Sequence, residues 1–314
     1  MNDAIISVKD LKKFYGSQKV LDGINFEVER GQIFALLGEN GAGKTTTIRI
    51  LSTLIRPDEG IAMIDGLDTS REANEVRKRI SLTGQYATVD ELLTGEENLQ
   101  MMGHLNHLNR STVKKRTATL LRQFDLLDAA KKQAKSYSGG MRRRLDIALG
   151  LLANPKVIFL DEPTTGLDPR SRLNMWTLIQ ELAKNGTTIF LTTQYLEEAD
   201  QLADKIALIH NGKIVVEGTA TELKKMIGEE KLVLQFQSPA NLMKAHNLLD
   251  GQLNHASNSL ILTAKDSTED LRNTLNTLHE QDMMPIDIYF RKPTLEDVFM
   301  EITSHKQEGE VKYG

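Results

Sequence analysis

The sequence predicts an α/β protein with a mostly parallel sheet covered by helices on both faces, followed by a small second domain. Apolar strands alternate with helices, and a glycine-rich loop joins the apolar run Ile33 to Leu37 to an amphipathic run from Thr45 to Ile55. After the charged segment Lys224 to Lys231, strands and helices follow a new rhythm. We therefore predict a first domain at 1–223, a linker at 224–231, a C-terminal domain at 232–305 and a flexible polar tail at 306–314.

The first domain begins with β structure. Ile5 to Val8, Lys19 to Val28 and Ile33 to Leu37 are predicted strands, and Ile61 to Ile64 is a short strand after the first helix. Between residues 86 and 154 the spacing of Leu, Met and Ala is helical, which indicates an inserted helical subdomain. The remaining predicted elements are a helix Ser70 to Arg79, a strand Ile80 to Thr83, a strand Val157 to Leu160, a helix Arg170 to Asn185, a strand Thr188 to Thr192, a helix Leu196 to Ala203 and a strand Ile206 to His210.

The C-terminal part starts after a predicted hairpin. Asn211-Gly212 is a strong type I′ turn signal between Ile206 to His210 and Ile214 to Glu217. Beyond the linker the predicted order of elements is βαββαβ plus a helix, which is compatible with a small ferredoxin-like sandwich.

Composition limits the class of protein. The chain has 314 residues, no cysteine and a net charge of -4, so disulfides and thiolate metal sites are excluded and no nucleic-acid partner is expected. Its beginning, Met1-Asn2-Asp3-Ala4, lacks the pattern of a signal peptide, and no apolar run approaches the roughly 18 residues of a membrane span. We expect a cytoplasmic protein in which any crossing of a membrane is left to another chain.

The glycine-rich loop carries the clearest chemical signal. Gly38 to Thr45 fits the pattern G-x-x-x-x-G-K-[ST], whose backbone N–H groups surround phosphate oxygens at a helix N-terminus. The pattern predicts that Lys44 reaches the β- and γ-phosphates and that the Thr45 hydroxyl ligates Mg²⁺. The alternative is a glycine turn without a ligand. The predicted binding residues for ATP are Gly38, Glu39, Asn40, Gly41, Ala42, Gly43, Lys44, Thr45 and Thr46.

A second signal is the pair of carboxylates that ends the apolar strand Val157 to Leu160. In a doubly wound sheet, ligands bind beyond the carboxyl ends of the strands, so Asp161 and Glu162 are expected beside the glycine loop. Asp161 suits a hold on Mg²⁺, and Glu162 can orient the attacking water and accept its proton. The alternative is the polar start of a turn.

Together these motifs resemble the nucleotide-binding subunit of ABC transporters, in the subgroup similar to daunorubicin-resistance ATP-binding subunits. The resemblance covers roughly residues 1 to 220 and extends more weakly to Pro293 to Phe299. It implies a P-loop fold with a RecA-like sheet, an antiparallel β subdomain and a helical subdomain. It also implies that Tyr15 stacks on adenine and that Gln85 touches Mg²⁺ or the water.

The most specific match is Tyr137-Ser138-Gly139-Gly140-Met141, which resembles the ABC signature. The helix start at Ser138, Gly139 and Gly140 is suited to bind a second phosphate group. In this family it faces a partner subunit, which implies a head-to-tail homodimer in the presence of ATP. The family usually has Leu and Gln at positions 137 and 141, and we expect these departures to be tolerated because the backbone does most of the binding.

Two further positions match the family. Asp168, in Gly166-Leu167-Asp168, corresponds to the D-loop that communicates across the dimer. Gln194 stands where most members have histidine; its amide can donate to the γ-phosphate but does not titrate near neutral pH. The run Arg142-Arg143-Arg144 resembles a nucleic-acid patch, but the negative net charge favours a role near the nucleotide and in interdomain contacts.

The resemblance implies an ATPase that acts with Lys44, Glu162 and Gln194, uses ATP and Mg²⁺, and energises a separate ABC-2 type permease from the inner face of the cell membrane. The subgroup suggests export of a hydrophobic compound or drug. One alternative is a soluble ABC ATPase acting in translation or DNA repair, but such proteins usually carry two cassettes or a long coiled coil, and the interval from Gln85 to Ser138 has no room for one. A regulator without hydrolysis is the other alternative, and the intact Glu162 argues against it.

Overall fold

The computed structural model describes residues 4–84, 88–227, 230–264, 267–281 and 283–309. The chain divides into two compact units at residues 1–220 and 221–314. This division falls three residues before the predicted end of the first domain at 223. Residues 224–226 do not form a linker, because they complete helix α8 (Ala220–Met226), in which Leu223 is buried. The charged composition of this segment reflects exposure to solvent, and Lys and Glu are also good helix formers.

The first unit is built on a six-stranded sheet with the strand order β10-β9-β3-β8-β7-β6. Neighbouring strands are parallel from β9 to β6, and β10 pairs antiparallel with β9. Every residue of the three middle strands is buried, as expected for a sheet covered on both faces. The strands are β3 (Ile33–Leu37), β6 (Ile80–Thr83), β7 (Val157–Asp161), β8 (Thr188–Thr193), β9 (Lys205–His210) and β10 (Lys213–Gly218).

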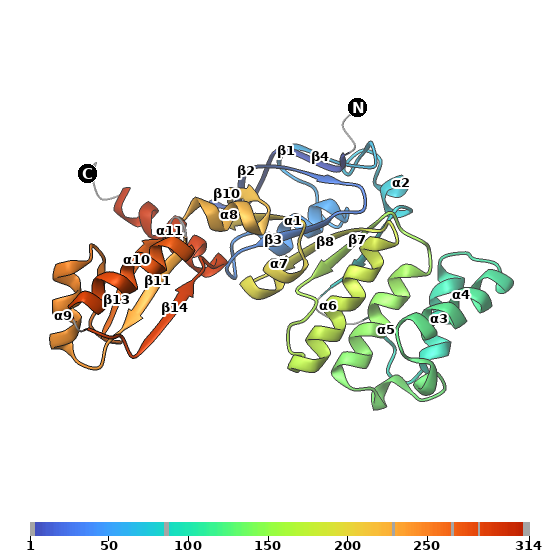
Figure 1. Cartoon of the computed structure of the whole chain (residues 1–314). Helices are drawn as coiled ribbons and strands as arrows, with labels where there is room; N and C mark the ends of the chain where they lie inside the picture. Colours follow the sequence, from blue (N-terminus) through green and yellow to red (C-terminus); the bar gives the residue numbers. More distant parts are fainter. Residues whose placement is uncertain (1–3, 85–87, 228–229, 265–266, 282, 310–314) are drawn as a thin grey trace. The chain divides into compact units, whose positions relative to one another are not determined.

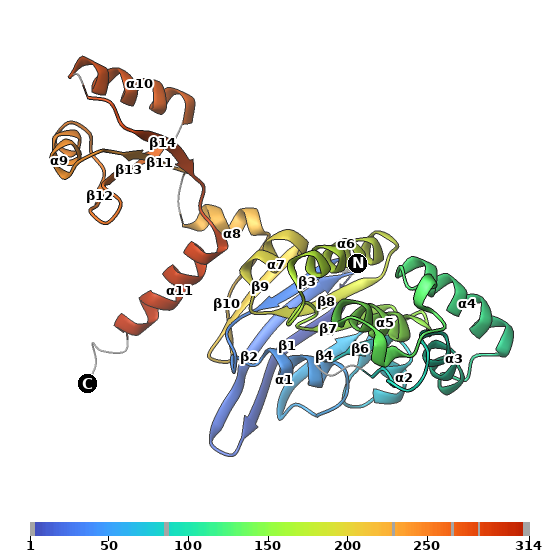
Figure 2. The ribbon, with the colours of Figure 1, turned by 90° about the horizontal axis from the view of Figure 1, so that it is seen from below.

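Helices lie against this sheet on both faces (Figures 1 and 2). Helix α1 (Lys44–Leu51) packs with a four-stranded antiparallel sheet on one face, in a core that includes Phe26, Phe34 and Phe190. Helices α6 (Pro169–Lys184) and α7 (Leu196–Leu202) cover the other face. The predicted doubly covered α/β sheet is therefore confirmed.

The antiparallel sheet has the order β2-β1-β4-β5. Its strand β1 runs from Ala4 to Tyr15 and pairs with β2 (Gln18–Glu29), so the predicted strand Ile5 to Val8 is too short. The reason is a bulge between Val8 and Leu11 that interrupts the alternation without ending the strand. The other two strands are β4 (Glu59–Ile64) and β5 (Leu67–Asp68).

The predicted helix Ser70 to Arg79 is also shorter in the structure. Helix α2 covers only Ala73–Arg77. The Asp68 carboxylate accepts hydrogen bonds from the backbone N–H groups of Ser70 and Arg71, which fixes a turn in place of the first helical residues.

The predicted helical subdomain is observed. It contains α3 (Gly95–Leu105), α4 (Arg110–Gln123), short 3₁₀ turns at Leu127–Ala129 and Ala134–Ser136, and α5 (Gly139–Leu151). Helix α3 begins with a capping box in which Thr94 and Glu97 bind each other's backbone N–H groups. Figures 1 and 2 place α3 and α4 beside α5 and away from the central sheet.

The second unit has a sheet of its own with the order β12-β13-β11-β14, in which every pair is antiparallel. Its core joins Leu232, Leu234 and Leu260 of the sheet to Leu242 and Leu278 of two helices. The elements are β11 (Glu230–Gln235), α9 (Pro239–Leu248), β12 (Gln252–Asn254), β13 (Ser259–Ala264), α10 (Ser267–Glu280), β14 (Asp287–Arg291) and α11 (Leu295–Gly309). The predicted order βαββαβ plus a helix is the observed one, and the strand order is compatible with a ferredoxin-like sandwich.

Within the described ranges of the chain, none of the helices combines the length and the apolar character that a membrane span requires.

Candidate nucleotide site

The glycine loop lies between β3 and α1, at the carboxyl end of the central sheet. The Gly38 N–H donates to the Thr193 carbonyl (3.2 Å), which fixes the start of the loop against β8. A Cβ atom at Gly38 would collide with the carbonyl oxygen of Ile209. Gly43 has φ +112°, and a Cβ there would lie 2.6 Å from Cδ2 of Leu21. Close packing and backbone conformation thus both require glycine at these two positions.

Lys44 is the first residue of α1 and is buried. Its Nζ donates to the carbonyls of Gly38 (2.8 Å) and Glu39 (3.0 Å), and it lies 3.6 Å from Oε1 of Glu162. Burial lowers the pKa of Lys44, and the carboxylates of Glu162, Asp161 and Glu39 oppose this shift. The geometry holds a cation between the glycine loop and the end of β7.

A pocket of about 370 Å³ opens in front of Lys44. It brings together the end of β1, the start of β2, the glycine loop, the first turn of α1 and the residue after β7. Tyr15, at one side of it, is 50% exposed and carries the Lys13 ammonium 5.6 Å from its ring centre. The lining residues are Tyr15, Gln18, Val20, Asn40, Gly41, Gly43, Lys44, Thr45, Thr46 and Glu162.

The two carboxylates at the end of β7 have different surroundings. Asp161 is buried, and its Oδ1 accepts a 2.5 Å hydrogen bond from the Thr192 hydroxyl on β8. Glu162 has φ +48°, a left-handed conformation that is uncommon for residues other than glycine, and its N–H donates to the Thr192 carbonyl (3.1 Å). Its Oε2 accepts a hydrogen bond from the Thr165 hydroxyl (3.3 Å). The backbone thus turns the Glu162 side chain toward the pocket that also contains Lys44.

Gln194 follows β8 directly, one residue after Thr193, which binds the start of the glycine loop. Gln194, Gly38 and Asp161 therefore lie at the ends of three neighbouring parallel strands. This edge is where a doubly wound sheet binds ligands. The other predicted contact, Gln85, lies outside the described residues.

The signature segment does not line this pocket. Ser138 caps α5 by accepting a hydrogen bond from the Met141 N–H (3.2 Å), and Ser138 and Gly139 are exposed. Asp168 caps α6 and accepts hydrogen bonds from the N–H (3.0 Å) and the hydroxyl (2.6 Å) of Ser171, which hold the pKa of Asp168 below its ordinary value. The two caps are neighbours, because a Cβ at Gly140 would lie 2.7 Å from the Ser171 hydroxyl oxygen.

The arginine run after the signature is used within the chain. Arg142 pairs with Glu91 (2.9 Å), and Arg144 binds the Phe124 carbonyl (2.9 Å) and the Asp125 carboxylate (3.1 Å).

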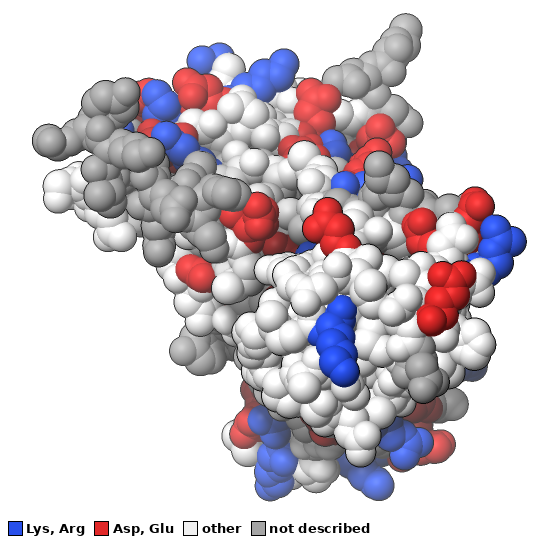
Figure 3. Space-filling view, turned by 60° about the vertical axis from the view of Figure 1, so that its left-hand side comes forward, with Lys and Arg blue, Asp and Glu red and all other residues white. Residues whose placement is uncertain are grey.

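Figure 3 shows acidic and basic side chains interspersed on one face of the molecule. The sequence did not predict the pairings of Arg142 and Arg144, nor the contact of Thr192 with Asp161, because each joins residues distant in the chain.

Comparisons with known proteins agree with this geometry. A family described as "ABC transporter" matches residues 21–165. The chain is 45% identical to the daunorubicin resistance ATP-binding protein DrrA3 of Streptomyces coeruleorubidus, over 96% of this chain and 97% of that protein. It is 38% identical to the Nod factor export ATP-binding protein I of Ralstonia nicotianae, over 96% and 94% of the two chains. A dimeric structure of the ATP-binding cassette MJ0796 with ADP and Pi is 25% identical, with a TM-score of 0.61 over 68% of this chain and 98% of that one.

Proposed function

Because the chain belongs to the ATP-binding subunits of ABC transporters, we propose that two copies of it bind two ATP molecules between them and power a separate membrane permease. The family hydrolyses ATP, and the relatives named for daunorubicin resistance and for Nod factor export favour a transport role over that of a soluble ATPase of translation or DNA repair. The observation that carries the proposal is the pocket in which the glycine loop, Lys44 and Glu162 meet.

The residues of this pocket suit the reaction. The N–H groups of the loop and the Lys44 ammonium bind the phosphates of ATP, and the exposed ring of Tyr15 offers a surface for adenine. Glu162 orients a water molecule and accepts its proton as the water oxygen bonds to the γ-phosphorus and the bond to ADP breaks. Gln194, at the end of β8, donates its amide to the γ-phosphate.

Mg²⁺ fits the donor set on this edge. The Thr45 hydroxyl and the Asp161 carboxylate are hard oxygen ligands, and Gln85 is a third proposed contact. When bound, Mg²⁺ neutralises charge on the phosphate oxygens. In the part of the chain that the structure describes, no three His, Cys, Asp or Glu residues are grouped to hold a metal, so the proposed site depends on the nucleotide for further oxygen ligands.

The second half of each site is proposed to come from the partner copy. Ser138, Gly139 and Gly140 form an exposed helix start apart from the chain's own pocket, and the helix dipole favours phosphate there. Asp168 stands beside this helix start and would contact the partner across the two-fold axis. The dimeric cassette MJ0796 supports this arrangement.

The proposed partner outside the dimer is an ABC-2 type permease, with this chain bound to it at the inner face of the membrane. The relatives named for daunorubicin resistance and for Nod factor export support an export system. Because one of these relatives is named for resistance to daunorubicin, we propose a hydrophobic compound or drug as the exported substrate.

Two variants test the mechanism. Lys44→Ala should weaken ATP binding at least about tenfold, because a charge-assisted contact to phosphate is lost, whereas Lys184→Ala, exposed at the end of α6, should bind ATP like the wild type. Glu162→Gln should retain ATP binding, lose about 10²-fold or more of hydrolysis and accumulate as an ATP-bound dimer in size-exclusion chromatography. The exposed Glu181→Gln is its control. Unchanged affinity in Lys44→Ala, or rapid hydrolysis in Glu162→Gln, would contradict the proposed roles.

The transporter role needs a separate measurement. Affinity purification of the chain from detergent-solubilised native membranes should recover a polytopic membrane protein in stoichiometric amount. Recovery only with ribosomes or nucleic acid would leave the ATPase chemistry intact and overturn the proposed role in transport.

A further inference from the structure

Arg143, in the second turn of the signature helix α5, binds the backbone on both sides of Glu162. Its Nη2 donates to the Asp161 carbonyl (3.1 Å) and its Nε donates to the Pro163 carbonyl (3.1 Å). Its Nη1 donates to the Gly84 carbonyl (2.6 Å). Three donors of one planar guanidinium thus join α5 to the end of β7 and to the end of β6.

Asp146, one helical turn further along α5, completes the arrangement. It is buried and lies 3.5 Å from Nη1 of Arg143, and its Oδ1 accepts hydrogen bonds from the N–H (2.8 Å) and the hydroxyl (2.6 Å) of Thr88. Gly84 and Thr88 are the described residues on either side of 85–87. The pair Arg143–Asp146 therefore binds both flanks of the segment that contains Gln85.

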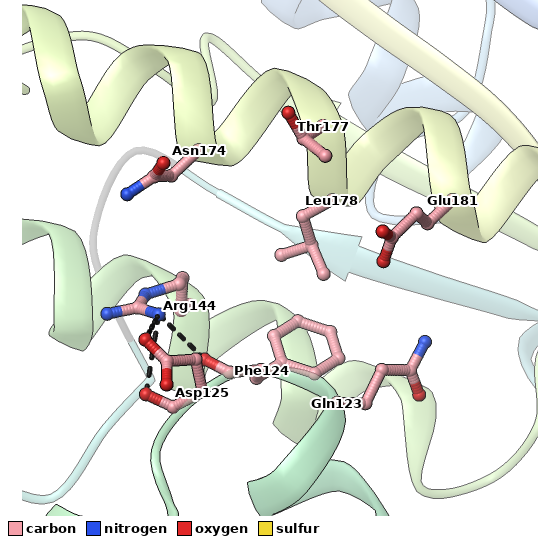
Figure 4. A pocket seen from close by; sticks show the side chains of 8 residues that line it. All are labelled: Gln123, Phe124, Asp125, Arg144, Asn174, Thr177, Leu178 and Glu181. Carbon is pink, nitrogen blue, oxygen red and sulfur yellow. Dashed lines mark hydrogen bonds and ion pairs between the residues drawn. The ribbon is translucent and has the colours of Figure 1, made fainter.

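The neighbouring arginines do something different, although they share the helix and the charge. The hydrogen bonds of Arg144 go to the helical subdomain, to the Phe124 carbonyl and to Asp125, as Figure 4 shows. Arg142 pairs with Glu91 of the same subdomain. Among the three, Arg143 is the one that reaches the strand end carrying Asp161 and Glu162.

The backbone that Arg143 binds requires such support. Glu162 has a left-handed φ of +48°, which an L-residue adopts at a cost and which persists only where surrounding contacts determine it. The Glu162 N–H is fixed by Thr192 of β8, and the carbonyls before and after Glu162 are fixed by Arg143. A planar fork with donors in set directions suits this task better than a single ammonium group.

We propose that Arg143, aligned by Asp146, is a positioning residue for hydrolysis that fixes the backbone of Glu162 and ties it to the helix that begins with the signature. The proposal rests on the proposed function of Glu162 and adds a connection within one chain. Ser138, which caps α5, faces the partner's nucleotide in the proposed dimer, and the second turn of α5 binds the strand end that carries the chain's own Glu162. A shift of α5 would therefore move the Glu162 backbone.

The test compares Arg143→Met and Arg143→Lys with Arg144→Met as a matched control on the same helix. We expect kcat for ATP hydrolysis to fall about 10- to 100-fold in Arg143→Met, because a displacement of about 1 Å is enough for such a loss. The fall should be smaller in Arg143→Lys, which retains the charge and can still bind part of the carbonyl set. KM and the affinity for a fluorescent ATP analogue should stay within about threefold of the wild type. Arg144→Met should keep the wild-type kcat.

Combining Arg143→Lys with Glu162→Gln tests whether the arginine acts through Glu162. In the Glu162→Gln background, Arg143→Lys should change the residual hydrolysis less than it changes the wild type, because the carboxylate that it positions is gone. An equal fold-change in both backgrounds would overturn the proposal. So would a wild-type kcat in both Arg143 variants, or an equal fall in Arg144→Met.

The role of Glu162 as the base and the role of Arg143 in positioning it can be tested separately. A wild-type kcat in the Arg143 variants beside an inactive Glu162→Gln overturns only the positioning role. Rapid hydrolysis by Glu162→Gln removes the proposed base itself, and the positioning role is then overturned with it. If Arg143→Met does not fold, as judged by its thermal unfolding, Arg143→Lys carries the comparison with Arg144→Met.

Discussion

Thr192→Val removes a hydroxyl from the centre of the candidate site with almost no change of shape. Thr192 is fully buried on β8, and its Oγ1 donates the 2.5 Å hydrogen bond to Asp161. A hydrogen bond to a charged group contributes about 1.5–3 kcal/mol, and a buried carboxylate oxygen left without its donor adds a desolvation cost. We expect the free energy of unfolding of the first unit to fall by about 2–3 kcal/mol. The Glu162 N–H also donates to the Thr192 hydroxyl oxygen (3.2 Å), but it keeps its bond to the Thr192 carbonyl (3.1 Å), so the main loss falls on the Asp161 carboxylate.

Thr188→Val is the matched control, because Thr188 is also buried on β8 and its hydroxyl accepts a hydrogen bond from the neutral N–H of Gly31 (3.0 Å). Its loss should cost only about 1 kcal/mol. Urea unfolding followed by the fluorescence of Trp176, the one tryptophan of the chain and a buried residue of α6, reports on the first unit alone. A loss in Thr192→Val no larger than that in Thr188→Val would refute the argument from charge.

Three other perturbations address groups elsewhere in the first unit. Asp65→Asn should lower the free energy of unfolding of the first unit by about 1–2 kcal/mol, because the Asp65 carboxylate pairs with Arg30, Arg79 and Lys156. A loss that is the same at low salt and at about 1 M salt would show that these ion pairs are not its cause. Burial raises the pKa of Glu198 above its ordinary value of 4.5. Protonated Glu198 therefore contributes to the free energy of unfolding below pH 4.5, and this contribution is lost as the pH rises through the higher pKa of the folded state. Glu198→Gln should remove this dependence, and equal slopes of urea midpoint against pH in both proteins would exclude it. Gln194→His should add an acidic limb near about pH 6.5 to the pH–rate profile, and identical acidic limbs would rule out the non-titrating role of Gln194.

Local patterns were enough to predict the arrangement around the glycine loop. Gly38 to Thr45 and the strand ending at Asp161 are contiguous motifs, and the rule that ligands bind beyond parallel strands placed them together. The observed distance between Lys44 and Glu162 agrees with that expectation. The βαββαβ order of the second unit was also readable, because its strands and helices alternate with clear turn residues.

Tertiary contacts account for what the sequence did not predict. The extension of β1 to Tyr15 depends on pairing with β2 across a bulge, and the short α2 depends on the Asp68 side chain. The contacts of Arg143 with residues before and after Glu162 join positions about twenty apart through the fold, and no spacing rule distinguishes it from Arg142 and Arg144. Position 85 is outside the described residues, so the expected role of Gln85 stays a prediction.

The separation of the exposed Ser138 and Gly139 from the pocket of Lys44 has a consequence for cells that make two versions of this chain. In the proposed dimer each copy supplies one half of both sites, so a defective copy damages its intact partner as well. With equal amounts of wild type and Lys44→Ala, random pairing leaves about one quarter of the dimers with two intact sites. Such a defect would therefore behave as partly dominant, and an inactive copy expressed in excess would act as a genetic inhibitor of transport.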